Sequence, residues 1–424
     1  MYKLTFTLKQ HTPIIHFQHD QAGATLRASE VKPKLDKFII EQCKLTEIIT
    51  VDNKPKEVPK EEFKNYFINE GKQHLALDYK MRVEGIGENK YKGLLDLKAK
   101  TIKLENGNLK ETLDTSITIP TYFGNLMKLN EFKDGKPFKK VSYFDTVTLI
   151  IFTSNEKLRD NINSCIDNFF FLNNFGTRQS KGFGSFTNMN NENKVSIPYL
   201  AFNIDKNQEN PFEIVFNVIN YYHPRLKSGV NYSFQKKVAP PKKNPPRFCH
   251  YQEAYIKIYL REKKMDYIWD KKWLKEIFFP LTPSAENKKL VRAFLGLSYD
   301  FKFGTNINPC NPIGVLPKSK IEISLNLEKN EIERIKSPIT YKPIKVKDEW
   351  RIYILVKDIH IKENNNLITD HEFEFKFQQS NGKLNTPKEL IDYHDLINKY
   401  NLNLTKSFKA FFFNGKYIDV SINI

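Results

Sequence analysis

Alternating and helical spacings of apolar residues predict the elements of the first half of the chain. From Tyr2 to Leu8 apolar and polar residues alternate, which is typical of a half-buried strand. A helix is expected from about Ser29 to Glu41, with Ser29 as its N-cap. The almost wholly apolar run Thr146–Thr153 predicts a central strand covered on both faces. From Glu156 to Asn173 apolar residues recur every three or four positions, which predicts an amphipathic helix.

The second half of the chain begins after a polar stretch that ends near residue 211. Strand-like runs follow at Phe212–Ile219, Ala254–Leu260, Ile321–Leu327, Trp350–Val356 and Glu372–Phe377, and helical patterns at Trp269–Phe279 and Glu286–Leu297. Because 424 residues exceed the usual size of one hydrophobic core, we expect an α+β protein of two domains. We place these domains at residues 1–205 and 206–424, with an insertion in the first at about residues 42–120.

The chain carries a large excess of positive charge, with a formal net charge of +18. Such an excess favours a polyanionic partner through phosphate neutralisation and counterion release, so nucleic acid is the leading class of partner. A basic protein of the membrane surface would need an amphipathic basic helix or a lipidation signal, and the sequence has neither. No long apolar run or signal peptide is apparent, and the four cysteines are widely spaced, so we expect a cytoplasmic protein with reduced thiols.

The segment 173–186, NNFGTRQSKGFGSF, is the most informative part of the sequence. Gly176 is expected to end the preceding helix in a left-handed conformation, while Gly182 and Gly184 would let the backbone approach a ligand. Arg178 and Lys181 would then lie beside outward-facing amides, an arrangement suited to phosphate oxygens.

Two other interpretations of this segment stay open. Phe183 could stack on a base or anchor the loop inward, and the whole segment could be an ordinary tight turn from helix to strand. A phosphate-binding loop of the nucleotide-fold type is disfavoured, because such a loop precedes a helix whereas here the helix comes first.

A basic, proline-rich stretch, KKVAPPKKNPPR at residues 236–247, cannot belong to a core. Its prolines favour an extended, solvated backbone. Lys242, Lys243 and Arg247 therefore belong either to a flexible phosphate-binding finger or to an inert linker.

The motif GTRQSKGFGSF resembles the glycine-rich loop of the RAMP superfamily of CRISPR proteins. Other segments resemble the branch formed by the first subunit of the Cmr complex: HTPIIHFQHDQAGATLRASEVKPKLDKFI near the start, YFG at 122–124, LVRAFLGLSYDFKFG at 290–304 and RIKSPITYKPI at 334–344. The chain departs from the branch at Gln18, His19 and Pro33, where glycine-containing segments are usual, so its first loop would grip RNA differently.

This resemblance implies two tandem ferredoxin-like (RRM/RAMP) domains and a non-catalytic, RNA-binding place at the capping end of a type III-B CRISPR ribonucleoprotein effector in antiviral defence. The implied partners are CRISPR RNA near its 3′ end, target RNA, and the neighbouring RAMP backbone and small subunits. Arg27, Lys32 and Lys34 would line the same groove as the glycine-rich loop, with Arg292 and Lys302 as their counterparts in the second domain. The full set of predicted RNA-binding residues is Arg27, Lys32, Lys34, Gly176, Arg178, Lys181, Gly182, Phe183, Gly184, Lys242, Lys243, Arg247, Arg292 and Lys302.

Histidines near the N-terminus carry the main alternative, a metal-independent endoribonuclease that processes precursor CRISPR RNA. His11, His16 and His19 lie close together, but their spacing in an irregular loop specifies no catalytic geometry. His16, His19 and Asp20 could also be metal ligands, although ordinary loop histidines are more common, and we expect neither metal nor cofactor. A protein-binding scaffold with no RNA role is the third class, and the salt dependence of RNA affinity would separate it from the others.

Overall fold

The computed structural model describes a large part of the chain. The described residues are 1–15, 25–52, 54–68, 75–86, 99–103, 109–113, 143–189, 197–204, 211–235, 247–265, 295–296, 300–303, 321–325, 337–357, 372–377, 380–385, 391–404, 411–413 and 416–423. No helix in these ranges is long and apolar enough to cross a membrane.

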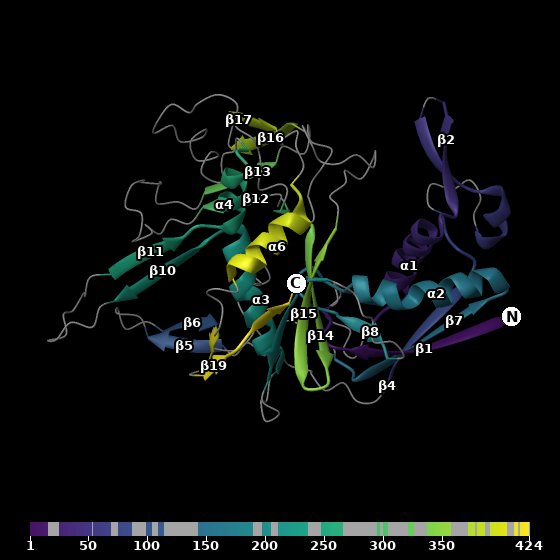
Figure 1. The fold of residues 1–424 in the computed structure, drawn as a ribbon, viewed down its shortest axis with the longest axis horizontal. Coiled ribbons are helices and arrows are strands. Elements are labelled where there is room, and N and C mark those ends of the chain that lie inside the picture. The colour runs from purple at the N-terminus through teal and green to yellow at the C-terminus, as the bar shows by residue number, and fades with distance from the viewer. Residues whose placement is uncertain are drawn as a thin grey trace. The chain divides into compact units, whose positions relative to one another are not determined.

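The N-terminal sheet has the connectivity of a ferredoxin-like domain (Figure 1). In chain order its elements are β1 (Tyr2–Gln10), α1 (Ala28–Cys43), β4 (Lys80–Ile86), β7 (Thr146–Thr153), α2 (Glu156–Leu172) and β8 (Phe186–Asn188). The strands lie in the order β4-β7-β1-β8, and each pair is antiparallel. This βαββαβ arrangement confirms the ferredoxin-like fold expected for the first part of the chain.

Burial along the strands explains why this sheet forms. In β7 the buried residues are Val147, Leu149, Ile151 and Thr153, and the residues between them are half-exposed. The expectation of a strand covered on both faces is therefore wrong, because only one face is covered, as in an ordinary half-buried antiparallel strand. Helices α1 and α2 pack together within the same hydrophobic core, where the rings of Phe38 and Phe169 lie 5.6 Å apart.

The two helices begin in different ways. In α2 the N-cap Asn155 accepts a hydrogen bond from the Leu158 amide at 3.0 Å, as its residue type favours. Helix α1 begins one residue before the predicted Ser29 cap. Its N-cap is Arg27, whose carbonyl accepts the amides of Glu30 and Val31 while its side chain makes no cap bond.

The α1–α2 contact also brings together two free cysteines, Cys43 and Cys165. Their sulfur atoms lie 3.8 Å apart, and burial raises the pKa of the Cys43 thiol to about 12. The Cys43 thiol is therefore kept protonated and unreactive at neutral pH.

The chain between α1 and β7 carries extra elements. These are the hairpin of β2 (Thr46–Val51) and β3 (Lys54–Pro59), the 3-10 helix η1 (Glu61–Tyr66), and the pair β5 (Ala99–Lys103) and β6 (Leu109–Leu113). They lie in the stretch where we expect an insertion, and its exact limits remain a prediction.

A second four-stranded sheet repeats the same connectivity. Its elements in chain order are β9 (Tyr199–Asn203), α3 (Pro211–Lys227), β14 (Ile339–Val346), β15 (Glu349–Val356), α6 (Tyr393–Leu404) and β20 (Ser421–Asn423). Its strands lie in the order β14-β15-β9-β20. In both sheets, therefore, the second strand along the chain lies at one edge, followed by the third, the first and the fourth. The ferredoxin-like order thus occurs twice, which confirms an α+β fold of two such domains with insertions.

The remaining elements lie, in chain order, between those of the second sheet. They are β10 (Val230–Gln235), β11 (Arg247–Gln252), α4 (Tyr255–Glu262), β12 (Asp300–Phe303), β13 (Ile321–Leu325), β16 (Glu372–Phe377), β17 (Ser380–Asn385), β18 (Phe411–Phe413) and β19 (Lys416–Ile418). The strands predicted at the positions of β13, β15 and β16 are confirmed. The two helices predicted between residues 269 and 297 lie, apart from residues 295–296, outside the described ranges.

Two predicted strands of the second half are helices. The run Phe212–Ile219 belongs to α3, and most of Ala254–Leu260 belongs to α4. In α3 six of these eight residues are buried, namely Phe212, Ile214, Val215, Phe216, Val218 and Ile219. A helix that is apolar on nearly all sides has no clear period, so a short stretch of it cannot be distinguished from a buried strand.

The chain forms two compact units. The first comprises residues 1–219, 341–355 and 409–424, and the second comprises residues 220–340 and 356–408. The first unit contains almost all residues of the two ferredoxin-like sheets, and the second contains a third four-stranded sheet of order β12-β13-β16-β17. The domain boundary near residue 205 remains a prediction.

Candidate nucleic-acid interface

The glycine-rich loop joins α2 to β8 and is closed at its base by backbone hydrogen bonds. The Phe175 amide donates to the Gly184 carbonyl at 2.9 Å, and Asn174 and Ser185 form an isolated antiparallel bridge. The segment after β1 closes the loop from the other side, because its Ile15 carbonyl accepts the Thr177 amide at 2.7 Å. The loop therefore has a fixed conformation set by its own backbone and by the end of β1.

The three glycines of the loop are required because neighbouring atoms of the protein leave no room for a Cβ atom, and not because a ligand approaches the backbone. All three have positive φ: +79° at Gly176, +92° at Gly182 and +65° at Gly184. A Cβ atom on Gly184 would lie 2.0 Å from the Phe175 carbonyl oxygen, and one on Gly176 would lie 2.6 Å from the Ile15 carbonyl oxygen. The expectation that Gly176 ends α2 is also wrong, since α2 ends at Leu172.

The amides of these glycines point inward, which corrects the prediction that they face a phosphate backbone. The Gly176 amide donates to the Glu30 carboxylate at 2.7 Å, the Gly182 amide to the Gln179 carbonyl at 3.3 Å, and the Gly184 amide to the Pro13 carbonyl at 2.9 Å. Amides with internal acceptors have no hydrogen left to donate to phosphate oxygens. The amides of these three glycines are therefore not available to an RNA backbone.

Phe183 anchors the loop inward. Its side chain is buried and stacks on Phe216 of α3, with ring centroids 4.0 Å apart and ring planes 12° apart. Of the two interpretations left open by the sequence, the inward anchor is the one observed. The predicted contact of Phe183 with RNA is wrong, because the ring is buried and already stacks on Phe216.

The tip of the loop, Thr177–Lys181, is half-exposed and is held in place from both sides. The Asn174 side-chain amide donates to the Gln179 carbonyl at 2.7 Å and to the Tyr341 carbonyl of β14 at 2.8 Å. The Tyr341 amide in turn donates to the Ser180 carbonyl at 3.2 Å. Bonds on both sides thus hold the tip against the edge of β14.

Arg178 lies in this tip with φ of +57°, in the left-handed region that disfavours residues with a Cβ atom. That conformation costs about 1 kcal/mol relative to glycine, so local backbone geometry does not explain an arginine at this position. Lys181 follows three residues later and is also half-exposed. The tip therefore carries two cationic residues on a fixed backbone, and their RNA-binding role remains a prediction.

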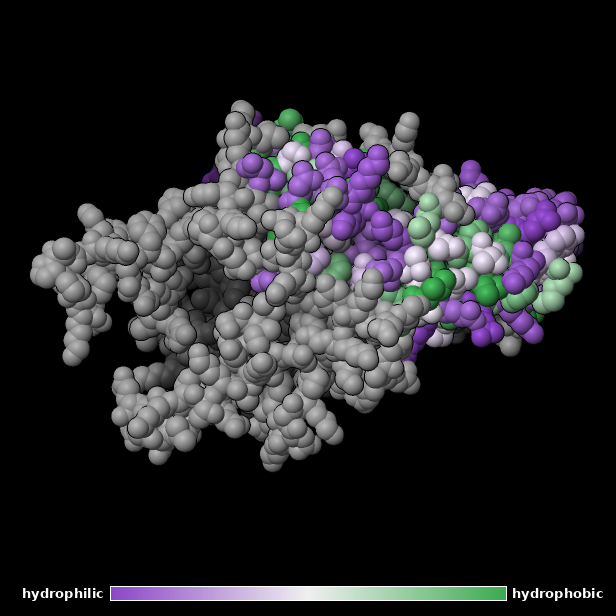
Figure 2. Space-filling view, turned by 90° about the horizontal axis from the view of Figure 1, so that it is seen from below, coloured by the Kyte–Doolittle hydropathy of each residue, from purple (hydrophilic) through white to green (hydrophobic). Residues whose placement is uncertain are grey.

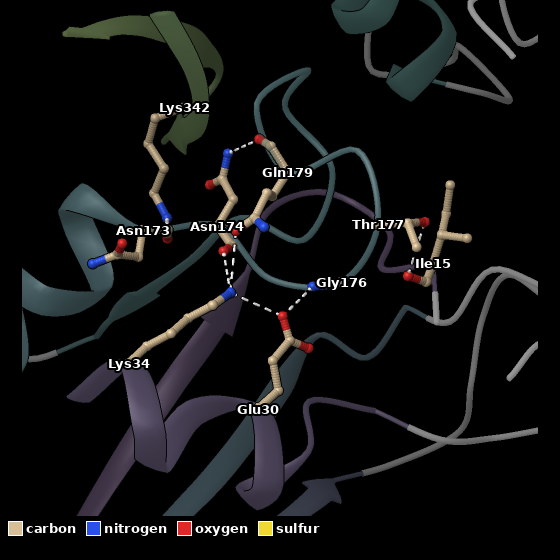
Figure 3. A network of polar contacts seen from close by, with 9 residues as sticks. All are labelled: Ile15, Glu30, Lys34, Asn173, Asn174, Gly176, Thr177, Gln179 and Lys342. Carbon is tan, nitrogen blue, oxygen red and sulfur yellow. Dashed lines mark hydrogen bonds and ion pairs between the residues drawn. The ribbon is translucent and has the colours of Figure 1, made fainter. Parts of the chain in front are cut away.

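Lys34 of α1 joins the helix to the loop (Figure 3). Its ammonium group donates to the Glu30 carboxylate at 3.0 Å and to the Gln179 side-chain oxygen at 3.1 Å, and it lies 4.9 Å from the centre of the Phe175 ring. Lys34 therefore places a third positive charge at the tip, although Glu30 offsets part of that charge.

Lys32 and Arg27 lie on the same helix as Lys34 or directly before it. The Lys32 ammonium pairs with Asp36 at 2.9 Å, donates to the Leu77 carbonyl at 2.9 Å, and lies over the Tyr79 ring. Burial raises the pKa of the Asp36 carboxyl, and the Lys32 charge opposes that shift. Lys32 is thus half-exposed with its ammonium paired, Arg27 is half-exposed too, and the RNA-binding role of both remains a prediction.

A lysine from the second sheet lies behind the loop. Lys342 of β14 is completely buried, and its ammonium group donates to three backbone carbonyls: Phe170 at 2.7 Å, Asn173 at 2.8 Å and Phe186 at 2.8 Å. Phe170 and Asn173 lie at the C-terminal end of α2, where carbonyls lack helical partners and the helix dipole favours a cation. Lys342 therefore joins β14 of the second sheet to α2 and β8, and in Figure 3 it lies beside Asn173, where the chain leaves α2 for the glycine-rich loop.

Two protein-family models match the chain, one in each half. The Cmr1 N-terminal domain family matches residues 1–230, and the Cmr1 C-terminal domain family matches residues 251–421. The chain belongs to the Cmr1 family. The RAMP and Cmr resemblance recognised in the glycine-rich motif is thereby confirmed.

Two solved structures are similar to this Cmr1-family chain. A crystal structure of Cmr1 from Pyrococcus furiosus in the apo form has 11% sequence identity and a TM-score of 0.35, and the match covers 85% of this chain and 90% of that one. A chain in a cryo-EM structure of the type III-B Cmr-beta complex, bound to cognate target RNA and AMPPnP, has 11% identity and a TM-score of 0.33, covering 86% and 95%. No curated protein matches the sequence.

His11 of this Cmr1-family chain is a buried, neutral component of the junction between the two sheets. Its Nδ1 atom accepts the Lys345 amide at 3.0 Å, so in the neutral ring Nε2 carries the hydrogen and donates to the Thr187 hydroxyl at 2.7 Å. Burial, reinforced by the charges of Lys342 and Lys9, lowers the pKa of His11 well below 6.5. Both ring nitrogens have structural partners, so the observed geometry does not suit a general base.

This lowered pKa predicts that the Cmr1-family protein loses stability as the pH falls below 6.5. In that range the unfolded chain binds a proton at His11 and the folded chain does not, so the free energy of unfolding falls by up to about 1.4 kcal/mol per pH unit. Thermal unfolding of wild type and His11→Asn between about pH 5 and pH 7 tests this, because asparagine keeps the acceptor for Lys345 but does not titrate. Parallel pH profiles for the two proteins would contradict the assignment.

Several predicted residues lie where the structure says nothing of their side chains. Lys242, Lys243, Arg292, His16, His19 and Asp20 fall outside the described ranges. Arg247 begins β11 and Lys302 lies in β12, but only the backbone of these two residues is described. Within the described ranges no group of three or more His, Cys, Asp or Glu residues could hold a metal ion.

The sequence analysis did not single out Lys342, although this lysine of β14 is completely buried. One signal was available. The lysine interrupts the otherwise buried run ITYKPI at residues 339–344, and a lone cation within such a strand implies buried acceptors. Nothing in the sequence pointed to the carbonyls of α2 and β8 as those acceptors.

Proposed function

We propose that this chain is a non-catalytic RNA-binding subunit of a type III-B Cmr effector, contacting CRISPR RNA near its 3′ end and target RNA. The observation that carries the proposal is the glycine-rich loop. Internal hydrogen bonds hold its backbone in place, while Arg178 and Lys181 lie at its half-exposed tip. Cations on a fixed backbone lose little entropy on binding phosphate, which favours a defined position for the RNA strand.

The charge of the whole chain supports the same partner. A net charge of +18 attracts a polyanion over a distance and orients it before contact. The described surface seen from below is mostly hydrophilic with small hydrophobic groups, which suits a wet, polar interface (Figure 2). The neighbouring RAMP backbone and small subunits complete the proposed set of partners.

The endoribonuclease alternative loses one of its three histidines. His11 is buried, uses both ring nitrogens in the fold and has a lowered pKa, so it is poorly suited to accept a proton from a ribose hydroxyl. The proposal therefore assigns no catalytic residue to this chain. Incubating the purified chain with labelled CRISPR repeat RNA and no other subunit tests this point, and the RNA is expected to stay intact.

Replacing both tip cations is expected to weaken RNA binding without unfolding the protein. In the double variant Arg178→Ala, Lys181→Ala we expect affinity for single-stranded CRISPR RNA to fall on the order of tenfold or more. The slope of log K against log salt should become shallower by about 1.4, or about 0.7 for each lost phosphate contact. Fluorescence anisotropy over a range of salt concentrations measures both quantities.

The matched control is Lys44→Ala, Lys347→Ala. Like Arg178, both lysines have positive φ, both are exposed, and neither lies in the loop. This variant removes the same total charge, so it should change RNA affinity and the salt slope much less. Equal losses in the two double variants would mean that general charge, not the loop, binds the RNA.

A further inference from the structure

The β2–β3 hairpin stands clear of helices α1 and α2 (Figure 1). It forms a sheet of two strands, and within the described ranges no third strand pairs with it. Two strands alone are marginally stable in water, and an open strand edge is a template for pairing with another chain.

The two outer edges of the hairpin differ in their capacity to accept a strand. The Lys60 amide donates to the Leu45 carbonyl at 3.0 Å, so the hydrogen-bonded pairs are residues 45 and 60, 47 and 58, 49 and 56, and 51 and 54. The intervening pairs direct their amides and carbonyls outward. On β3 these outward residues are Pro55, Glu57 and Pro59, and proline has no amide hydrogen.

The outer edge of β2 has no such block. Its outward residues are Thr46, Ile48 and Thr50, all of which carry an amide hydrogen. The strand is also unusually apolar for an exposed one: the Ile48 side chain is 72% exposed, and Ile49 and Val51 are exposed too. A bare apolar edge of this kind is a liability for a protein unless another chain covers it.

The charge of the hairpin indicates which class of molecule covers the outer edge of β2. Residues 46–60 contain three acidic residues, Glu47, Asp52 and Glu57, and three basic ones, Lys54, Lys56 and Lys60, so the hairpin is neutral in a chain of net charge +18. A neutral, apolar surface does not attract a polyanion, whereas main-chain bonding with apolar side-chain contacts is the usual mode of strand addition between proteins.

We propose that the outer edge of β2 accepts an extended segment of a neighbouring protein subunit as a third strand. A second copy of this chain is a poorer occupant, because pairing along a six-residue strand covers far less than the about 1,200 Å² of a stable interface. A neighbouring subunit of a larger assembly is held by other contacts as well. The proposal relies on membership of the Cmr1 family and goes beyond RNA binding, on which it does not depend.

The test compares proline substitutions on the two outer edges of the hairpin. Each variant of the full chain is coexpressed with the products of its neighbouring genes, and the complex is purified through a tag on this chain. Ile48→Pro removes an outward amide from β2, and the matched control Glu57→Pro removes the outward amide of its cross-strand partner on β3. We expect Ile48→Pro to reduce recovery of one neighbouring subunit at least tenfold, while Glu57→Pro recovers it as wild type does. RNA affinity of the isolated chain should be unchanged in both variants, which separates this test from that of the proposed function.

Hydrogen exchange supplies a second measurement on the unsubstituted protein. The amides of Ile48 and Thr50 should exchange rapidly in the isolated chain and slowly in the assembled complex. The proposal is overturned if both variants assemble normally, if both lose the subunit equally, or if these amides exchange at the same rate in both states. Protection by RNA alone, or by dimerisation of the isolated chain, would also overturn it.

Discussion

Replacing Lys342 with methionine is expected to lower the free energy of unfolding by about 4 kcal/mol. Methionine has a similar length but no donor, so the carbonyls of Phe170, Asn173 and Phe186 would lose their shared partner inside the protein. Each unsatisfied buried carbonyl costs about 1–3 kcal/mol, and local relaxation recovers only part of that. The effect is large because a single side chain serves three acceptors from two elements.

Lys347→Met is the control for this substitution. Lys347 lies exposed at the turn that follows β14, five residues along the chain, so its loss should change the free energy of unfolding by less than about 0.5 kcal/mol. Urea unfolding followed by tryptophan fluorescence compares the three proteins. Equal stability of Lys342→Met and Lys347→Met would show that the carbonyls find other partners.

Gly184→Ala is expected to destabilise the protein by about 3 kcal/mol or more, or to prevent folding. The added Cβ would lie 2.0 Å from the Phe175 carbonyl oxygen, in the residue whose amide donates to the Gly184 carbonyl, and the φ of +65° disfavours alanine in addition. A backbone atom cannot rotate out of the way as the end of a side chain can, so the base of the loop must open. Soluble yield and the thermal unfolding midpoint measure the outcome.

The same substitution at Gly85 is the comparison. There the new Cβ would approach the Phe144 ring at 3.0 Å, and the ring of a side chain, unlike a backbone carbonyl, can shift by a few tenths of an ångström. We expect a loss below about 1 kcal/mol for Gly85→Ala. A similar loss at both glycines would mean that the loop base adapts and that Gly184 is not required by packing.

Where the pattern of apolar residues was clear, prediction from the sequence succeeded. The strand at β1 and the helix at α2 were located within a few residues, because each element buries one face and leaves the other to water, whereas the strand at β7 was located from its apolar run. In α3 the same reasoning failed, since burial on nearly all sides removes the period. The glycine-rich loop was recognised as special from its composition alone.

The chemistry of that loop could not be predicted in full. Glycine at 176, 182 and 184 indicated an unusual backbone, but two purposes require such a backbone: contact with a ligand and close packing. Packing proved to be the reason, and the exposed chemistry is confined to the tip around Arg178. Which purpose applies depends on carbonyls such as those of Pro13 and Ile15, more than 160 residues earlier in the chain.

By itself, the sequence determined the elements with a clear apolar pattern, such as β1 and α2, the Cmr1 family and the excess of positive charge, because these depend on residue identity and local spacing. The tertiary structure alone decided which donors and acceptors are used internally. It turned the Phe183 ring inward, gave His11 two partners and placed the Lys342 ammonium among three carbonyls. The physical reason is that a hydrogen bond joins atoms close in space, and the residues that meet beneath this loop are far apart in the chain.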